Sequence, residues 1–272
     1  MRLSGISTYP VKGCHGLVHD EAGVRPWGLD GDRRWMLVDD EGIGITQRDL
    51  ASLVRVHARP GPEGLLLHAD GHSDLVVPEP TDVTPVPVRT FRRRVLRVDA
   101  LPAGPVADAW FTDVLGRPVR LVRLARPARH IPRGEREYDP GDQVSFADAY
   151  PVLLTNTASL AALGDWLDAS GAQPVPMTRF RPNLVVDGAA AWAEDDWPGR
   201  GLRIGGVRFR AAGPSARCLV ITTDQETGVR GREPLRTLAR HRNIGRKLLF
   251  GLNLVPLEAG RVRLGDPVEL LD

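Results

Sequence analysis

The sequence predicts a mainly β fold with a few helices, an α+β protein made of two halves. In the first half, short runs of β-favouring residues are interrupted every 8 to 12 residues by Gly, Pro or Asp. In the second half, similar runs are separated by two segments whose apolar residues have helical spacing. Short strands joined by tight turns are typical of antiparallel barrels and sandwiches, so we expect a β-barrel-like architecture in the first half.

The composition excludes several classes of protein. The chain has 272 residues, of which 42% are apolar and 26% charged, as in ordinary globular proteins. A net charge of +2 offers no broad basic surface to nucleic acid, and we interpret the run Arg92–Arg94 as a solvated strand edge. No apolar run approaches the ~18 residues of a membrane helix. Residues 1–12 also lack the apolar core of a secretory signal. We therefore expect a cytoplasmic protein with reduced cysteines and without nucleic-acid or membrane partners.

Residues 1–125 are expected to form the first domain. The turn sequences Asp39–Gly42 and Ala69–Gly71 predict hairpins, because Asp and Gly adopt the positive φ of tight turns. One helix is predicted over Val106–Leu115. The predicted strands are Gly5–Tyr9, Trp35–Val38, Ile43–Gln47, Leu53–Ala58, Leu65–Ala69, Leu75–Pro78, Val83–Arg89, Val95–Asp99 and Val119–Leu124.

Residues 126–272 are expected to form the second domain. Its first part, residues 126–142, has no usable period and is predicted to be either a domain linker or an active-site loop. A strand over Pro151–Thr155 leads into a helix that Asn156 and Thr157 can cap, and a second helix is predicted over Glu233–Arg242. The remaining predicted strands are Asn183–Asp187, Leu202–Ala211, Cys218–Thr222, Leu252–Leu257 and Val268–Leu271.

Cys218 is the first candidate for chemistry, since the chain has no Walker loop and no GxGxxG, HExxH, CxxC or GxSxG motif. It follows Arg217 at the start of an apolar run, and a neighbouring positive charge favours the thiolate form of a cysteine. A thiolate can bind a soft metal or act as a nucleophile. The alternative interpretation is that Cys218 is a small buried hydrophobic residue.

Two further segments indicate an anion site. Thr155 and Ser159 lie where a strand passes into a helix, and a helix start presents unpaired N–H groups to anions. The segment 179–183 places two arginines and Asn183 at the start of another strand, and arginine binds phosphate with two parallel hydrogen bonds. Each feature has a simpler interpretation, as a helix cap or as surface arginines. Taken with Cys218, they outline a site for a phosphate-bearing cofactor that also accepts a sulfur ligand.

The order of five motifs is similar to that of a known family. The second half contains FRPN at 180–183, RC at 217–218 followed by TTDQETG at 222–228, and GDPVELL at 265–271. The first half contains YPVKG at 9–13 and GDRRWMLVD at 31–39. Together these blocks resemble the MOSC domain of molybdenum cofactor sulfurases. They also resemble the MOSC N-terminal β-barrel domain that precedes it in the mitochondrial amidoxime-reducing component and its bacterial relatives. The resemblance implies a β-barrel in each domain.

The resemblance also implies a molybdenum–molybdopterin cofactor (Moco) whose metal is bound by the thiolate of Cys218. Asp224 joins Cys218 in the implied catalytic set and, with Thr222, shapes the metal pocket. Cys14 is given no metal role. The implied contacts to the pterin and its phosphate are Lys12, Arg33, Thr155, Ser159, Arg181, Asn183 and Thr222.

Two positions depart from the motifs of the family. Gly13 stands where serine often follows the lysine, so one hydroxyl contact to the cofactor is absent. Gln225 stands where proline often follows the aspartate, which alters the loop after the cysteine.

The activity implied by the resemblance is an oxidoreductase that removes the oxygen atom from an N-hydroxylated or N-oxide small molecule. Its electrons would come from a separate ferredoxin, flavoprotein or b-type cytochrome. The alternative is a sulfur-transfer protein that carries a persulfide on Cys218, or a carrier of the cofactor. The oligomeric state is left open.

Overall fold

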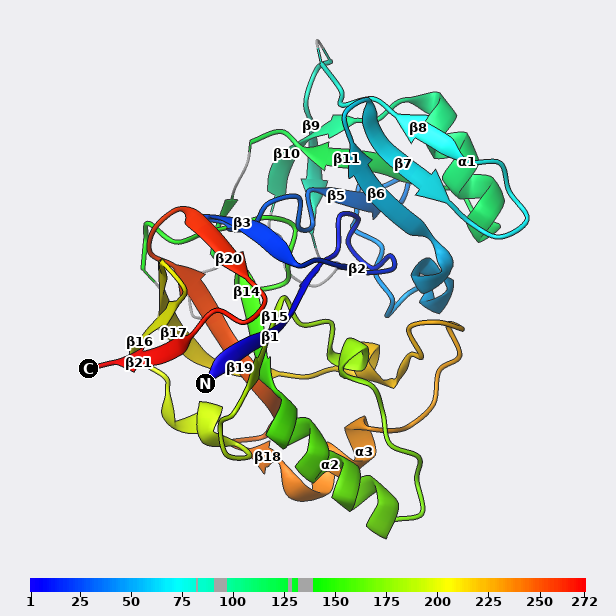
Figure 1. Cartoon of the computed structure of the whole chain (residues 1–272). Coiled ribbons are helices and arrows are strands. Elements are labelled where there is room, and N and C mark those ends of the chain that lie inside the picture. The colour runs from blue at the N-terminus through cyan, green and yellow to red at the C-terminus, as the bar shows by residue number, and fades with distance from the viewer. Residues whose placement is uncertain (82, 91–96, 127–128, 132–138) are drawn as a thin grey trace.

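A computed structural model of the chain describes residues 1–81, 83–90, 97–126, 129–131 and 139–272. The arginine run 92–94, part of the predicted strand Val95–Asp99 and residues 132–138 of the predicted linker lie outside the described residues. The fold is mainly β, as the sequence predicts, with three α-helices in the described part of the chain (Figure 1). These helices are α1 (Pro105–Leu115), α2 (Thr157–Ala169) and α3 (Leu235–His241).

The larger sheet has nine strands in the order β2-β1-β15-β14-β19-β17-β16-β21, with β18 paired to β19. All described pairings within it are antiparallel except that between β14 and β15. The strands are β1 (Arg2–Thr8), β2 (Leu17–Val18), β14 (Val152–Asn156), β15 (Leu184–Asp187), β16 (Gly201–Ile204), β17 (Val207–Ala216), β18 (Asn243–Ile244), β19 (Lys247–Pro256) and β21 (Val268–Leu271).

The first half contributes two smaller sheets, one of four strands (β5-β11-β10-β9) and one of three (β6-β7-β8). Helix α1 packs between them against β11 and β8, and its side chain Phe111 is fully buried. The strands are β5 (Trp35–Val38), β6 (His57–Gly61), β7 (Gly64–His68), β8 (Leu75–Val77), β9 (Val86–Arg89), β10 (Arg97–Pro102) and β11 (Arg120–Leu124). The predicted linker, residues 126–142, contributes β12 (Arg129–His130), which pairs with β13 (Gln143–Val144) directly after the linker.

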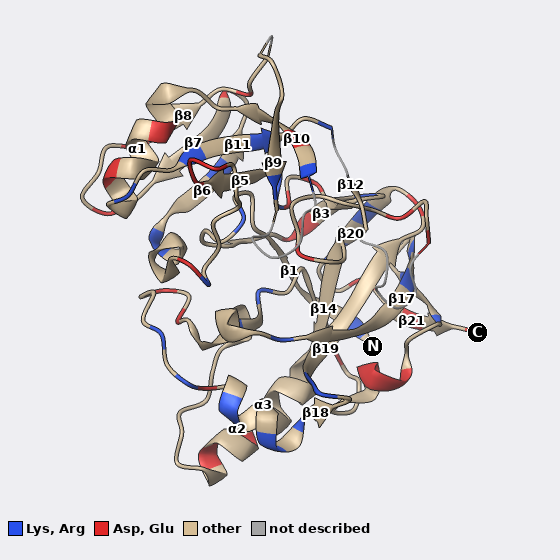
Figure 2. Cartoon of the chain, turned by 180° about the vertical axis from the view of Figure 1, so that it is seen from behind, with Lys and Arg blue, Asp and Glu red and all other residues tan. Residues whose placement is uncertain are grey.

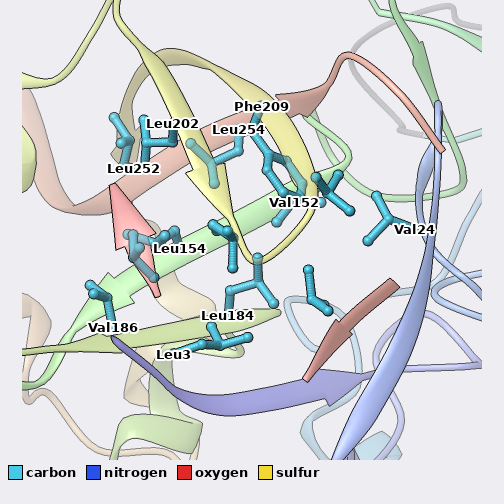
Figure 3. Packing of buried hydrophobic residues seen from close by; sticks show 14 of the residues in the cluster. Leu3, Val24, Val152, Leu154, Leu184, Val186, Leu202, Phe209, Leu252 and Leu254 are labelled. Carbon is cyan, nitrogen blue, oxygen red and sulfur yellow. The ribbon is translucent and has the colours of Figure 1, made fainter. Parts of the chain in front are cut away.

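The N-terminal strands cross into the second half. Strand β1 pairs with β15, and β3 (Glu21–Arg25) lies between β4 (Gly28–Leu29) and β20 (Gly260–Arg263). Leu3 and Val24 therefore pack into the same core cluster as Leu184 and Leu254 (Figure 3). The division at residue 125 remains a prediction, and two of the sheets extend across it.

Several predicted elements agree closely with the structure. Strands β5, β8 and β21 and helix α1 lie where the sequence predicts them, within one residue at each end. Asn156 caps α2 as expected, since its side-chain oxygen accepts a hydrogen bond from the N–H of Ala158 at 3.0 Å. Among the described residues, no helix is long and apolar enough to cross a membrane.

Three predicted strands differ from the structure here, and a fourth, Cys218–Thr222, is described with the site. The run Leu53–Ala58 begins as a 3-10 helix, Ala51–Arg55, which follows a turn in which the Asp49 carboxylate accepts hydrogen bonds from the N–H and hydroxyl of Thr46. The run Leu202–Ala211 is two strands, since Gly205, at a φ of 55°, and Gly206 form a hairpin turn between β16 and β17. Ile43–Gln47 forms only isolated bridges, at Ile43 and Gly44.

Candidate functional site

A cavity of about 580 Å³ is lined by residues from both halves of the chain. Lys12, Gly13, Arg33, Thr46, Gln47 and Arg48 line it from the first half. From the second half it is lined by segment 147–150, by Arg181 and Asn183, and by the end of β17 with Arg217 and Cys218. Ile244, Gly245 and Lys247 of the β18–β19 hairpin complete one side. Five of the nine sequence-predicted site residues therefore line one cavity, namely Lys12, Arg33, Arg181, Asn183 and Cys218.

The thiol of Cys218 is exposed at the end of β17. The sequence predicts a strand over Cys218–Thr222, and this prediction is wrong: Leu219–Thr222 is a 3-10 helix. The hydroxyl of Thr222 donates to the carbonyl of Leu219 at 2.8 Å, which gives the backbone a partner outside the sheet. Strand β17 ends at Ala216, and Cys218, two residues later, lines the cavity.

The guanidinium at hydrogen-bond distance from this sulfur is that of Arg48, with 3.4 Å between Nη1 and Sγ. The sequence points to Arg217 because it is adjacent in the chain. Arg217 instead donates to the carbonyl of Phe180 at 2.7 Å and to the hydroxyl of Ser215 at 3.0 Å. Burial lowers the pKa of Arg217 to about 10, so it keeps its charge at neutral pH. Both arginines thus supply positive charge near the thiol, and Arg48 makes the contact.

Arg33 and Arg181 enclose the ring of Tyr9, at 4.4 Å and 4.1 Å from its centre. Both arginines have left-handed backbones, with φ of 48° and 55°, a conformation that is costly for residues with a side chain and common at functional sites. Arg181 donates to the carbonyl of Cys14 and to Gln225, both at 2.8 Å, which fixes its guanidinium. Burial lowers the pKa of Arg181 to about 10, so it too remains charged at neutral pH.

Lys12 reaches the cavity from the turn that follows β1, and its side chain is 7% exposed. Its ammonium lies 2.7 Å from the carboxylate of Asp148, which also pairs with Arg48 at 3.4 Å. Desolvation opposes ionisation of Asp148, but the charges of Lys12 and Arg48 outweigh it and hold the pKa of the carboxyl well below its usual range. The carboxylate of Asp148 is therefore ionised at neutral pH.

Gly13 and Gln225, the two departures from the motifs, both have structural roles here. Gly13 has a φ of 90°, and a Cβ built on it would lie 2.9 Å from the side chain of Leu53, so serine would be strained. The amide of Gln225 is almost buried and pairs with the amide of Gln47 through two hydrogen bonds of 3.1 Å. The loop after Cys218 is thereby tied to the first half of the chain.

Four predicted site residues do not line this cavity, namely Thr155, Ser159, Thr222 and Asp224. Ser159 donates to Glu194 at 2.9 Å and accepts from the backbone of Trp192 at 2.8 Å. Asp224 accepts from the backbone N–H of Thr227 and pairs with Arg179 at 3.0 Å, and the Thr227 N–H lowers its pKa most. Hydrogen bonds within the chain thus occupy the start of α2 and the loop after Cys218, and the roles of these residues remain predictions.

Two residues of the cavity, Arg48 and Asp148, could not be identified as site residues from the sequence. Arg48 and Asp148 lie in irregular segments that match none of the motifs, and the charge of each is common on protein surfaces. Only the folded chain brings them together, 100 positions apart, beside Cys218.

The cavity is strongly cationic, although charges of both signs are spread over the whole ribbon (Figure 2). Among the described residues that line it, one carboxylate, Asp148, faces six cationic side chains. These are Lys12, Arg33, Arg48, Arg181, Arg217 and Lys247. Since low-dielectric walls strengthen such a field, the cavity is suited to an anionic ligand of small-molecule size.

The described residues contain no cluster of three or more His, Cys, Asp or Glu side chains that could hold a metal ion by themselves. A soft metal bound at Cys218 would take its other ligands from a second molecule in the cavity. The exposed thiol, the cationic walls and the volume fit a metal cofactor that carries its own sulfur donors and an anionic phosphate.

Sequence comparisons agree with this arrangement. The MOSC N-terminal beta barrel domain family matches residues 1–118, and the MOSC domain family matches residues 141–269. The chain is 34% identical to mitochondrial amidoxime-reducing component 1 of Homo sapiens, over 97% of this chain and 81% of that protein. It is 31% identical to mitochondrial amidoxime reducing component 2 of Bos taurus, over 98% of this chain and 82% of that protein. It is also 30% identical to the molybdenum cofactor sulfurase of Danio rerio, over 93% of this chain but 31% of that protein. The chain therefore belongs to the MOSC domain family, with a MOSC N-terminal β-barrel domain and a function related to the molybdenum cofactor.

Proposed function

We propose that the protein is a Moco-dependent oxidoreductase that removes the oxygen atom from N-hydroxylated or N-oxide compounds. The exposed thiol of Cys218 at a cationic cavity is the observation that carries this proposal. The similarity to amidoxime-reducing components supports the reaction type. For an N-hydroxylated amine, R–NHOH, two electrons and two protons give R–NH₂ and water.

The side chains of the cavity divide the work of holding the cofactor. Cys218 would supply the protein ligand to molybdenum, and the Arg48 guanidinium lies 3.4 Å from its sulfur. Lys12, Arg33 and Arg181 would bind the phosphate and the pterin, since guanidinium and ammonium groups form charge-assisted hydrogen bonds with such oxygens. When bound, the cofactor supplies a two-electron redox centre that can accept an oxygen atom from an N–O bond.

The fixed arginines of the cavity would keep the bound group in one orientation. Arg181 is held on both sides by hydrogen bonds of 2.8 Å, and Arg33 is held by Asp32 at 2.5 Å. Because these guanidiniums are already ordered, binding costs less side-chain entropy. The remaining volume would admit a small N-oxygenated substrate beside Cys218.

The electrons would come from an external donor. The described residues contain no cluster of three or more His, Cys, Asp or Glu side chains that could hold a redox metal by themselves. We propose a separate ferredoxin, flavoprotein or b-type cytochrome as the partner, and a cytoplasmic location.

Elemental and pterin analysis of the chain from a cofactor-producing host tests this function directly. We expect close to one molybdenum and one pterin per chain, and loss of bound molybdenum in Cys218→Ala. Cys14→Ala is the matched control and should keep its molybdenum. The loaded chain should reduce a benzamidoxime-type substrate when an artificial electron donor is supplied. Wild-type protein with neither metal nor pterin would rule the proposal out.

A sulfur-transfer or cofactor-carrier function is the second candidate, and the free, exposed thiol of Cys218 together with the similarity to a molybdenum cofactor sulfurase favours it. The two candidates differ in the state of this sulfur. A persulfide leaves Cys218 open to alkylation, with a mass increase of one sulfur atom that reductant removes. A thiolate bound to molybdenum is protected from alkylation until the metal is extracted.

A further inference from the structure

Asp148 is the one carboxylate among the described residues that line the cationic cavity. It lies in the short segment between β13 and β14, and its side chain is 53% exposed. A carboxylate placed there reduces the positive field that would attract an anionic ligand. Its position therefore calls for a functional explanation.

The contacts of Asp148 join the residues proposed to hold the cofactor. One carboxylate oxygen lies 2.7 Å from the ammonium of Lys12. The other lies 3.4 Å from both terminal nitrogens of Arg48, and Arg48 is also 3.4 Å from the sulfur of Cys218. Asp148 thus pairs with Lys12 and Arg48 through two oxygens and a negative charge, the same groups that a phosphate would present to them.

An incoming phosphate and this carboxylate compete for the same cations. If both stayed, the ammonium of Lys12 would have two anions within a few ångströms of each other. Two negative charges held this close repel each other, and the walls of the cavity screen that repulsion less than bulk water does. A dianionic phosphate with three acceptor oxygens can replace a carboxylate on Lys12 and Arg48, whereas a monovalent anion gains too little to do so.

We propose that Asp148 is an internal counter-ion that makes the cavity selective for phosphate-bearing ligands, which displace its carboxylate from Lys12 and Arg48. This inference rests on the proposed function only in taking the ligand to carry a phosphate. Asp148 then balances the buried charge of Lys12 in the empty protein and keeps small monovalent anions out of the cavity.

Titration of the full chain with inorganic phosphate tests the counter-ion. The protein is made in a host unable to synthesise the pterin, and phosphate affinity is measured by calorimetry at constant ionic strength. Asp148→Asn should bind phosphate at least about ten-fold more tightly than wild type, because the competing charge is gone. Asp165→Asn, an exposed carboxylate on α2, makes the same change in net charge and should leave the affinity within about two-fold.

The double variant Lys12→Gln/Asp148→Asn should lose the gain, since Lys12 is the cation released. Asp148→Ser removes the same charge and replaces the asparagine variant if that one does not give the cooperative unfolding of wild type. Phosphate affinity in Asp148→Asn that is equal to or weaker than that of wild type overturns the proposal. Tighter phosphate binding that persists in Lys12→Gln/Asp148→Asn overturns it as well. If wild type carries molybdenum but Asp148→Asn binds phosphate no more tightly, the counter-ion role is overturned and the proposed function stands. If wild type carries no molybdenum or pterin but Asp148→Asn binds phosphate more tightly, the proposed function is overturned and the counter-ion role stands.

Discussion

Arg181 illustrates how much of the site depends on single side chains. Its guanidinium is buried, hydrogen-bonded to Cys14 and Gln225, and packed on Tyr9. Arg179, two positions earlier, has the same side chain but pairs with Asp224 outside the cavity. The sequence presents the two arginines as equivalent, and the structure separates them because a left-handed backbone at residue 181 turns only that side chain inward.

We expect Arg181→Ala to lower pterin occupancy by at least half and to reduce stability by about 1 to 3 kcal/mol, since the buried carbonyl of Cys14 loses its donor and Gln225 keeps only the one from Gln47. Occupancy is measured by the fluorescence of the oxidised pterin, and stability by urea unfolding. Arg179→Ala is the matched control and should retain the pterin. Equal occupancy in the two variants would remove Arg181 from the cofactor site.

Cys14 makes stability depend on alkaline pH. Burial raises the pKa of its thiol to about 12, with Arg181 opposing the shift, whereas an unfolded cysteine titrates near 9. Between these two values the unfolded chain has released this proton and the folded chain still holds it. The unfolded state is therefore stabilised relative to the folded state as the pH rises, and this thiol lowers the free energy of unfolding by about 1.4 kcal/mol per pH unit in that window.

We expect the free energy of unfolding to fall less steeply between pH 9 and 11 in Cys14→Ala than in wild type. Urea unfolding at several pH values gives both slopes. Cys218→Ala, the same change at the other cysteine of the chain, is unfolded alongside as the matched variant. Parallel curves for Cys14→Ala and wild type would contradict this assignment.

At the scale of elements, an irregularity in β19 places Cys218. Pairing with β17 shifts by one residue between Leu252 and Leu249, so β19 carries an extra residue there. Gly251 lies in this β-bulge with a φ of 83°, and a Cβ on it would meet the carbonyl of Leu154 at 2.7 Å. Bulges bend a strand and end regular pairing, which is why β17 leaves the sheet just before Cys218.

Gly251→Ala should therefore destabilise the protein by about 2 to 4 kcal/mol, through the positive φ and the backbone clash. Gly164→Ala, in the middle of α2 with no atom within 4 Å of the new Cβ, should stabilise it by about 0.5 to 1 kcal/mol. Thermal and urea unfolding distinguish these opposite signs. A Gly251→Ala variant as stable as wild type would mean that the bulge does not require glycine.

Periodicity and turn residues were enough to predict the regular elements, including β5, β21 and α1. They fail where side chains redirect the backbone, as at Asp49 before the 3-10 helix Ala51–Arg55 and at Thr222 after Cys218. In the site, motif blocks lead to Lys12, Arg33, Arg181, Asn183 and Cys218. They cannot lead to Arg48 and Asp148, because the importance of these two comes from distances of 2.7 to 3.4 Å that exist only in the folded chain.

At the scale of the whole molecule, the two halves share a core. Leu3 and Val24 pack among residues of the C-terminal sheet, and the backbone N–H of Val268 bonds to the carbonyl of Met1 at 2.9 Å (Figures 1 and 3). Residues 126–272 alone would expose the edge of β15 and part of this cluster. Exposed edges and apolar surface favour aggregation.

We therefore expect a chain of residues 126–272 to show no cooperative thermal transition, in contrast to a single sharp transition for the full chain. Circular dichroism against temperature is the measurement. Addition of a peptide covering residues 1–30, which carries β1, β3 and β4, should restore part of the missing signal. Cooperative unfolding of the fragment alone, near the temperature of the full chain, would contradict a shared core.

The crossing of β1 and β3 between the halves also limits how the cavity can receive a ligand. A protein whose halves are joined by one flexible connection can open like a clamshell and close around its cargo. Here such an opening would break the ladder between β1 and β15 and expose Leu3 and Val24 to water. A bulky cofactor must therefore enter through the opening of a cavity that is already formed. The speed of its insertion will depend on side chains at that opening rather than on a hinge.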